Sequence, residues 1–125
     1  MFLSGPEGAG YIARLLKDNF YITELDLAQN KIKSFGAQAM AEVLADNCTL
    51  KKLNLSWNDF KDKDAECLAE GIRVNQTLTW LDLSHNGFAE EAGMLFGEKC
   101  AVVNTMQLTQ NRLYAFFVVV NLTDW

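Results

Sequence analysis

Three close neighbours, Asp82, Ser84 and His85, are the residue types from which a hydrolase triad is built. In such a triad the histidine removes the proton of the serine hydroxyl, and the carboxylate orients the histidine. The spacing argues against this chemistry. On an extended strand Asp82 and Ser84 point to the same side about 7 Å apart, His85 follows at the turn, and no glycine-rich loop supplies an oxyanion hole. We therefore expect these residues to be structural and the chain not to be an enzyme.

A metal or cofactor site is not expected either. The chain has one histidine and three cysteines, Cys48, Cys67 and Cys100, and the cysteines do not have the spacing of zinc ligands. The glycines form no phosphate-binding loop. Because three scattered cysteines cannot form a closed set of disulfides, they indicate reduced thiols and a cytoplasmic protein.

The elements that position these residues follow from a phrase that occurs four times. It has the form L-x-x-L-x-L-x-x-N, and its copies begin at Ile22, Leu50, Leu78 and, in a weaker form, Val103. Four asparagines end the copies: Asn30, Asn58, Asn86 and Asn111. The intervals between these asparagines are 28, 28 and 25 residues. This phrase at this period is the signature of a leucine-rich repeat.

Each phrase predicts a short strand that is followed by a turn and a helix. Alternate strand residues such as Leu53 and Leu55 point into the core, and the residues between them point out. The asparagine amide both donates and accepts, so stacked copies can satisfy the backbone of neighbouring turns. Left-handed caps are expected just after the helices, at Asn19, Asn47 and Asn75. The predicted fold is an α/β, right-handed leucine-rich repeat solenoid with a concave parallel sheet and convex helices.

The 28-residue period, with its full helix, resembles the ribonuclease-inhibitor class of leucine-rich repeat proteins. Two phrases are most similar to the leucine-rich-repeat-containing 74 proteins: Tyr21-Ile-Thr-Glu-Leu-Asp-Leu and Trp80-Leu-Asp-Leu-Ser-His-Asn. The resemblance to the class covers residues 5 to 111 and implies a binding surface rather than a catalytic centre.

The array is expected to span residues 1–111. Residues 5–19 match the helical half of a repeat, full repeats start near 22, 50 and 78, and a degenerate repeat starts near 103. Residues 112–125 form a divergent hydrophobic tail, which we expect to be an extra strand or a lid on the last repeat; the alternative is an end unrelated to the repeats. Because the chain starts within a repeat and lacks a polar cap, it is expected to be a segment of a longer array.

The composition favours a protein partner. A formal net charge of −5 and a pI near 4.7 oppose binding to nucleic acid or to an anionic membrane, since both select clustered lysine and arginine. A basic protein fits this charge better. The longest apolar run has eight residues, far fewer than the roughly 20 that a membrane-spanning helix needs.

Outward strand positions and strand exits form the candidate binding surface. Neighbouring strands lie about 4.8 Å apart, so Lys52 should lie between Glu24 and Trp80. Trp57 and Trp80 stand where the repeat requires no apolar side chain, and tryptophan is frequent at interface hot spots. The alternative is that they fold onto the sheet or onto Lys52 in a cation–π contact. The candidate partner-binding residues are Glu24, Asp26, Lys52, Asn54, Trp57, Trp80, Asp82 and His85.

These observations predict a non-catalytic protein-interaction scaffold that binds its partner on the concave face. The alternative is structural. In that case the chain self-associates through its uncapped ends, or it is a truncated fragment of a longer array with no binding activity of its own.

Overall fold

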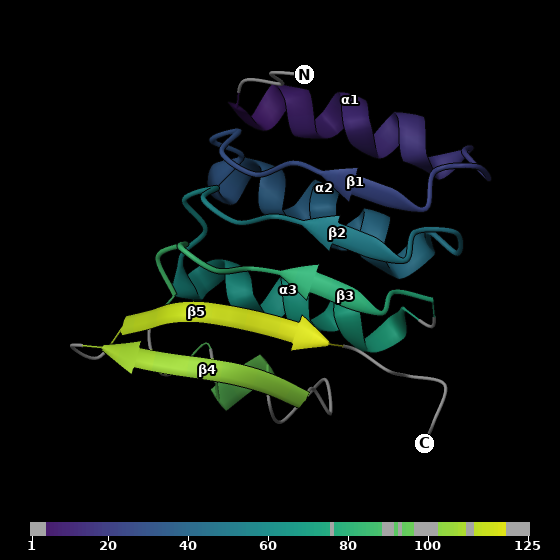
Figure 1. The fold of residues 1–125 in the computed structure, drawn as a ribbon. Coiled ribbons are helices and arrows are strands. Elements are labelled where there is room, and N and C mark those ends of the chain that lie inside the picture. Colours follow the sequence, from purple (N-terminus) through teal and green to yellow (C-terminus); the bar gives the residue numbers. More distant parts are fainter. Residues whose placement is uncertain are drawn as a thin grey trace.

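A computed structural model describes residues 5–75, 77–88, 92, 94–96, 103–109 and 112–119. Helices cover one face of a five-stranded sheet (Figure 1). The elements in chain order are α1 (Gly5–Lys17), β1 (Glu24–Asp26), α2 (Lys33–Asp46), β2 (Lys52–Asn54), α3 (Asp62–Val74), β3 (Trp80–Asp82), β4 (Val103–Thr109) and β5 (Arg112–Val119).

Strands β1, β2 and β3 form the parallel part of the sheet, in register with the sequence period. Leu25 pairs with Leu53, and Leu53 pairs with Leu81. Helix α2 connects β1 to β2, and α3 connects β2 to β3, so each repeat contributes one strand and one helix (Figure 1). The predicted α/β repeat solenoid is confirmed.

The leucines of the phrase build the core between the two layers. Leu53, Leu55, Leu81 and Leu83 are almost completely buried, and full burial of such a side chain contributes about 1.5 to 3 kcal/mol. Leu25 is only half-buried, because β1 lies at the end of the sheet and has one neighbouring strand. Stacking of repeats is therefore what buries these side chains.

Small residues set the distance between the helices. A Cβ atom on Gly71 would lie 2.5 Å from the carbonyl oxygen of Ala41 and 3.1 Å from the Cβ of Leu44. Helix α3 therefore touches the backbone of α2 at this point. An alanine at position 71 would force the two helices apart.

The helix ends differ from the prediction. Asn47 and Asn75 follow α2 and α3 with extended backbones, at φ −72° and ψ 133° and at φ −65° and ψ 134°. Their side chains complete the helix ends instead: the Oδ1 atom of Asn75 accepts hydrogen bonds from the N–H groups of Thr77 at 2.9 Å and Leu78 at 2.6 Å. The prediction of left-handed caps at these two positions is wrong, because side-chain acceptors turn the chain without a positive φ.

The C-terminal strands do not continue the parallel sheet. The phrase at Val103 predicts a fourth strand directly beside β3. Instead β5 pairs with β3 in the antiparallel direction, and β4 pairs with the other side of β5, which gives the order β1-β2-β3-β5-β4. The third interval is three residues short, and the apolar segment after it has a length suited to a strand of its own. Residues 112–119 form β5, and the remainder of the predicted tail, residues 120–125, lies outside the described residues.

Candidate functional site

One edge of the array, where each strand leads to the next helix, is held by asparagines; we term it the strand-exit edge. Three of them lie in a row: Asn30, Asn58 and Asn86. Asn58 is fully buried, and its Nδ2 donates to the carbonyl oxygens of Leu27 and Leu55, each at 3.0 Å. Its Oδ1 accepts from the backbone N–H of Asn30 at 3.0 Å. One amide therefore ties its own repeat to the preceding one. Asn111, the fourth residue expected in the row, lies outside the described residues.

Asn86 makes the same contacts one repeat later. Its Oδ1 accepts from the N–H groups of Asn58 at 2.8 Å and Phe60 at 3.1 Å. Its Nδ2 donates to the carbonyl oxygens of Leu55 at 3.1 Å and Leu83 at 3.0 Å. The contacts recur because the backbone around each asparagine recurs every 28 residues.

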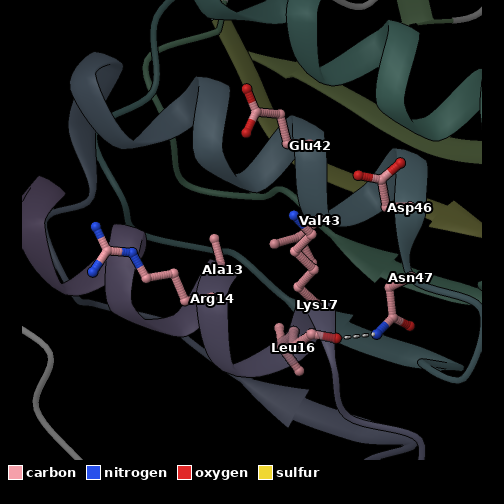
Figure 2. Close-up of a pocket in the computed structure, with 8 residues that line it drawn as sticks. All are labelled: Ala13, Arg14, Leu16, Lys17, Glu42, Val43, Asp46 and Asn47. Carbon is pink, nitrogen blue, oxygen red and sulfur yellow. Dashed lines mark hydrogen bonds between the residues drawn. The ribbon is translucent and has the colours of Figure 1, made fainter.

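A second asparagine row lies on the opposite edge, where each helix leads to the next strand; we term it the helix-exit edge. The Nδ2 of Asn75 donates to the carbonyl oxygens of Leu44 at 2.7 Å and Asn47 at 3.2 Å. The Nδ2 of Asn47 donates to the carbonyl oxygen of Leu16 at 3.3 Å (Figure 2). These bonds join each repeat to the preceding one, a role that sequence reasoning missed. The shared 28-residue interval of Asn19, Asn47 and Asn75 was the available signal.

Trp57 and His85 form a stacked pair on the strand-exit edge. Their ring centroids are 4.2 Å apart and their planes differ by 7°. Both residues have left-handed backbones, with φ 57° and 54°, which is uncommon for residues other than glycine. The N–H of Trp57 donates to the carbonyl oxygen of Ser84 at 3.2 Å, so neighbouring repeats support this conformation. Trp57 stacks on His85 rather than lying flat on the sheet, and 52 % of its surface stays exposed.

The sheet face opposite the helices carries the other outward residues. Glu24, Lys52 and Trp80 lie side by side in register on β1, β2 and β3. The Nζ of Lys52 lies 3.7 Å from the Oε1 of Glu24, and both side chains are largely exposed, so this ion pair adds at most about 1 kcal/mol to stability. A shallow hollow of about 380 Å³ lies over these strands, and its lining is Glu24, Leu25, Asp26, Lys52, Asn54 and Trp80.

Asp82 is placed differently from the other seven candidates, because it is buried. Its Oδ1 accepts from the N–H of Ser84 at 2.8 Å and from the Oγ of Ser84 at 2.5 Å. The two side chains meet because β3 ends at Asp82 and the chain turns at Ser84. Asn54 holds Ser56 in the same way, at 3.0 and 2.7 Å. The contact therefore belongs to the repeat, and the serine hydroxyl donates to the carboxylate instead of to a histidine.

The structure thus divides the eight candidates into three groups. Five line the hollow on the sheet face: Glu24, Asp26, Lys52, Asn54 and Trp80. Trp57 and His85 stack with each other at the strand exits. Asp82 supports a turn from within the protein. The accessible candidate site consists of the first two groups.

A further hollow, of about 210 Å³, lies between α1 and α2 on the helical face (Figure 2). Arg14 and Lys17 border it on α1, and Glu42 and Asp46 border it on α2. Val43 also lines this hollow, at the position that Gly71 occupies one repeat later. A side chain at this position keeps α1 and α2 apart, whereas glycine lets α3 touch α2.

The described thiols are Cys48, which is exposed, and Cys67, which is half-buried. Burial, and to a smaller extent the charge of Asp64, raises the pKa of the Cys67 thiol, which makes it less reactive than an ordinary cysteine. In the described parts of the chain no three metal-ligating side chains gather in one place. No described helix has the length and apolar character to cross a membrane.

Three successive stretches of the sequence match the Leucine Rich repeat family: residues 18–41, 46–69 and 74–97. They cover more than half of the chain. The protein therefore belongs to the leucine-rich repeat family, in agreement with the stacked strand–helix units and the asparagine rows.

Among solved structures, the chain is similar to that of Leiomodin-1 Actin-Binding Site 2. The TM-score is 0.65, the sequence identity is 23 %, and the match covers 74 % of this chain and 55 % of that chain. The chain therefore spans just over half of that neighbour, and at this identity the likeness concerns the fold. No curated protein sequence matches the chain.

Proposed function

We propose that this chain is a non-catalytic protein-interaction scaffold whose partner binds the sheet face and the adjoining Trp57–His85 pair. The sheet face is taken to be the concave face of the array. Leucine-rich repeats commonly offer an extended surface of this kind. The solved neighbour is named for an actin-binding site, and this supports a protein as the partner here as well.

The exposed ring of Trp57 is the observation that carries this proposal. Its backbone is fixed by hydrogen bonding to the next repeat, and its ring is held against the His85 ring at 4.2 Å. A large aromatic side chain that is ordered before binding loses little conformational entropy in a complex. Such residues supply much of the energy of protein interfaces. We therefore place the centre of the interface beside Trp57.

A basic protein segment is the proposed partner. Glu24 and Asp26 are exposed on β1, at the N-terminal end of the sheet face. Lys52 forms an ion pair with Glu24, and the whole chain carries a net charge of −5. Complementary charge speeds encounter and selects among partners. Nucleic acid and anionic membranes are disfavoured by the same charge.

Three further parts of the proposal rest on the sequence. The 28-residue period and full helices support membership of the ribonuclease-inhibitor-like class, with the leucine-rich-repeat-containing 74 proteins as the nearest group. The odd number and scattered spacing of the cysteines support a cytoplasmic location. The repeat origin of the Asp82–Ser84 contact supports a non-catalytic role.

The test compares protein capture from a cytosolic extract by the natural chain, Trp57→Ala, and Trp57→Ala with Trp80→Ala. Loss of a central aromatic typically costs about 2 kcal/mol or more, so we expect a specific partner to bind roughly 30-fold more weakly to either variant. Phe20→Ala is the control, because this ring is also exposed but lies between α1 and β1, outside both proposed surfaces. Unchanged capture by a folded double variant would refute the proposal. An early thermal transition in both variants would make the tryptophans packing residues.

Self-association is the second candidate function, and a specific observation at α1 favours it. Leu15, Val43 and Gly71 occupy the same position in successive repeats. Val43 is 6 % exposed, whereas Leu15 is 54 % exposed, because no helix precedes α1 in the described structure. Tyr11, one turn earlier on α1, is 65 % exposed. Leu15 and Tyr11 together form an apolar stripe on the outer side of α1.

Sedimentation at several protein concentrations tests this second candidate. If the stripe associates, the sedimentation coefficient rises with concentration, and Leu15→Arg abolishes the rise. Gln38→Arg is the matched control, since Gln38 is exposed but lies on α2, outside this stripe. A monomer at all concentrations would exclude this candidate and leave the first one untouched.

A further inference from the structure

Three lysines gather at one place on the strand-exit edge, although the chain as a whole is acidic. Lys33, Lys61 and Lys63 line a hollow of about 460 Å³ at the beginnings of α2 and α3. All three side chains are exposed. The remaining lining residues are Ser34, Phe35 and Asp59. We term this hollow the lysine hollow; it shares no residue with the candidate site on the sheet face.

Two of the three lysines stand on backbone that the repeat holds in place. Lys33 has a left-handed conformation, with φ 59°, and its N–H donates to the carbonyl oxygen of Asn58 at 2.8 Å. Lys61 forms a β-bridge with Gly87, and its Cδ lies 2.8 Å from the place where a Cβ of Gly87 would be. The Nζ of Lys61 lies 2.9 Å from the same place, so both the stem and the ammonium group lie over the Gly87 backbone. Positions fixed in advance reduce the entropy that binding costs.

The nearest buried acid, Asp64, holds the backbone and forms none of the ion pairs of the described residues. Asp64 is buried, and its Oδ2 accepts from the Oγ of Ser34 at 2.8 Å and from the N–H of Lys61 at 2.8 Å. Within the described residues, the ion pairs are Glu24 with Lys52 and Arg73 with Glu70. Asp59 is the one acid in the lining of the lysine hollow. Three ammonium groups stand against the carboxylates of Asp59 in the lining and of Asp64 behind Ser34, so the hollow keeps a net positive charge.

An aromatic ring completes the lysine hollow. Phe35 is 89 % exposed, and it directly follows Ser34 in the first turn of α2. An apolar ring beside several ammonium groups suits a ligand that joins carboxylates to an apolar side chain. Free inorganic anions would use the charges alone, and an extended polyanion would meet the acidic remainder of this chain, whose net charge is −5.

We propose that the lysine hollow binds an acidic protein segment whose carboxylates contact Lys33, Lys61 and Lys63 and whose apolar side chain packs on Phe35. The scaffold then has two surfaces of opposite preference, one for a basic partner on the sheet face and one for an acidic segment on the strand-exit edge. The second surface is independent of the first, because neither Trp57 nor Trp80 lines it.

Fluorescence anisotropy with the full chain tests this proposal. The probe is a short labelled peptide of aspartate and glutamate with one central phenylalanine. Lys33→Glu with Lys63→Glu should weaken binding at least tenfold, and Phe35→Ala should weaken it several-fold. Lys17→Glu with Lys51→Glu is the matched control, because it makes the same change in net charge at exposed lysines outside the lysine hollow. Trp57→Ala with Trp80→Ala should leave the affinity unchanged, so that failure of the sheet-face proposal remains distinguishable.

Several results would overturn the proposal. These are equal weakening by the control pair, an unchanged affinity in Phe35→Ala, and tighter binding of a single-stranded oligonucleotide or of phosphatidylserine vesicles than of the peptide. If the charge-reversed variant does not fold, the salt dependence of the natural chain decides. Binding that falls steeply from low to physiological ionic strength supports contacts with exposed lysines, and binding insensitive to salt refutes them.

Discussion

The two edges of the array use the same residue type in different ways. On the strand-exit edge, both ends of the Asn58 amide reach the preceding repeat, through Leu27 and Asn30. On the helix-exit edge, only the Nδ2 of Asn75 reaches the preceding repeat, while its Oδ1 binds the N–H groups of Thr77 and Leu78 in its own repeat. On the strand-exit edge both atoms of the asparagine amide join neighbouring repeats. On the helix-exit edge the Nδ2 joins neighbouring repeats, and the Oδ1 stabilises the turn within its own repeat.

The difference also explains where the unusual backbone lies. In the described residues every non-glycine residue with positive φ is on the strand-exit edge: Gln29, Lys31, Lys33, Trp57, Asp59 and His85. Such conformations persist only where the surroundings hold them in place, and the Asn58 row supplies that support. The Trp57–His85 pair, which adjoins the proposed sheet-face surface, and the lysine hollow both lie on this edge. Structural coupling and exposed functional side chains are therefore found together.

Asn58→Ala tests the stronger edge and should have the largest effect. It removes the partners of several buried backbone groups, and each such group costs about 1 to 3 kcal/mol. We expect the free energy of unfolding in urea to fall by about 2 to 4 kcal/mol. Asn58→Asp is the matched variant, since it keeps an acceptor and loses the donors. If the melting temperature of Asn58→Ala lay within a degree or so of that of the natural chain, the strand-exit edge would not be the stronger of the two edges.

Asn75→Ala tests the other edge and should destabilise the chain less, by about 1 to 2 kcal/mol. Two carbonyl oxygens, of Leu44 and Asn47, lose a donor, but the N–H of Thr77, which is only partly buried, can take water as its acceptor. Asn47→Ala, in the same row but half-buried, should cost less again. A greater loss for Asn75→Ala than for Asn58→Ala, measured in the same urea titration, would reverse the order of the edges.

Asp82→Asn should change the free energy of unfolding by less than about 1 kcal/mol. Asn54 holds Ser56 in the equivalent turn with the same contacts, so an amide is already accommodated at this position of the repeat. Asp82→Ala is the control, because it deprives the N–H and Oγ of Ser84 of their acceptor. If Asp82→Asn lowered the free energy of unfolding as much as Asp82→Ala, the carboxylate of Asp82 would have a role beyond holding the turn.

The smallest effect concerns the two described cysteines, Cys48 on the helix-exit edge and Cys67 within α3. Cys48 directly follows Asn47 and is exposed, whereas Cys67 donates to the carbonyl oxygen of Asp64 at 3.2 Å. Because burial raises the pKa of Cys67 and the thiolate is the reactive form, alkylation at neutral pH should be about tenfold faster at Cys48. The rate at Cys67 should rise at higher pH than for an ordinary thiol. Mass spectrometry of a Cys100→Ser variant gives both rates, and equal rates would contradict the burial of Cys67.

The repeat fold and its parallel register could be predicted from the sequence. Leu25, Leu53 and Leu81 pair across three strands as the 28-residue interval requires, because a short strand with inward leucines is specified locally and each copy meets an equivalent neighbour. Glu24, Lys52 and Trp80 were placed side by side for the same reason. Positions that repeat are therefore accessible to sequence reasoning.

The stacking of Trp57 on His85, the contact of Ser84 with Asp82 and the insertion of β5 beside β3 were decided by the tertiary structure. The first depends on two side chains that neighbouring repeats bring together at the strand exits. The second depends on a side-chain hydrogen bond that recurs between Asn54 and Ser56 but cannot be read from the residue types alone. The third depends on whether β4 or β5 pairs with the open side of β3. That choice is made between contacts of residues far apart in the sequence. The sequence by itself determined the repeated unit, because periodic burial is a local property. Only packing between units could determine what the outward side chains touch.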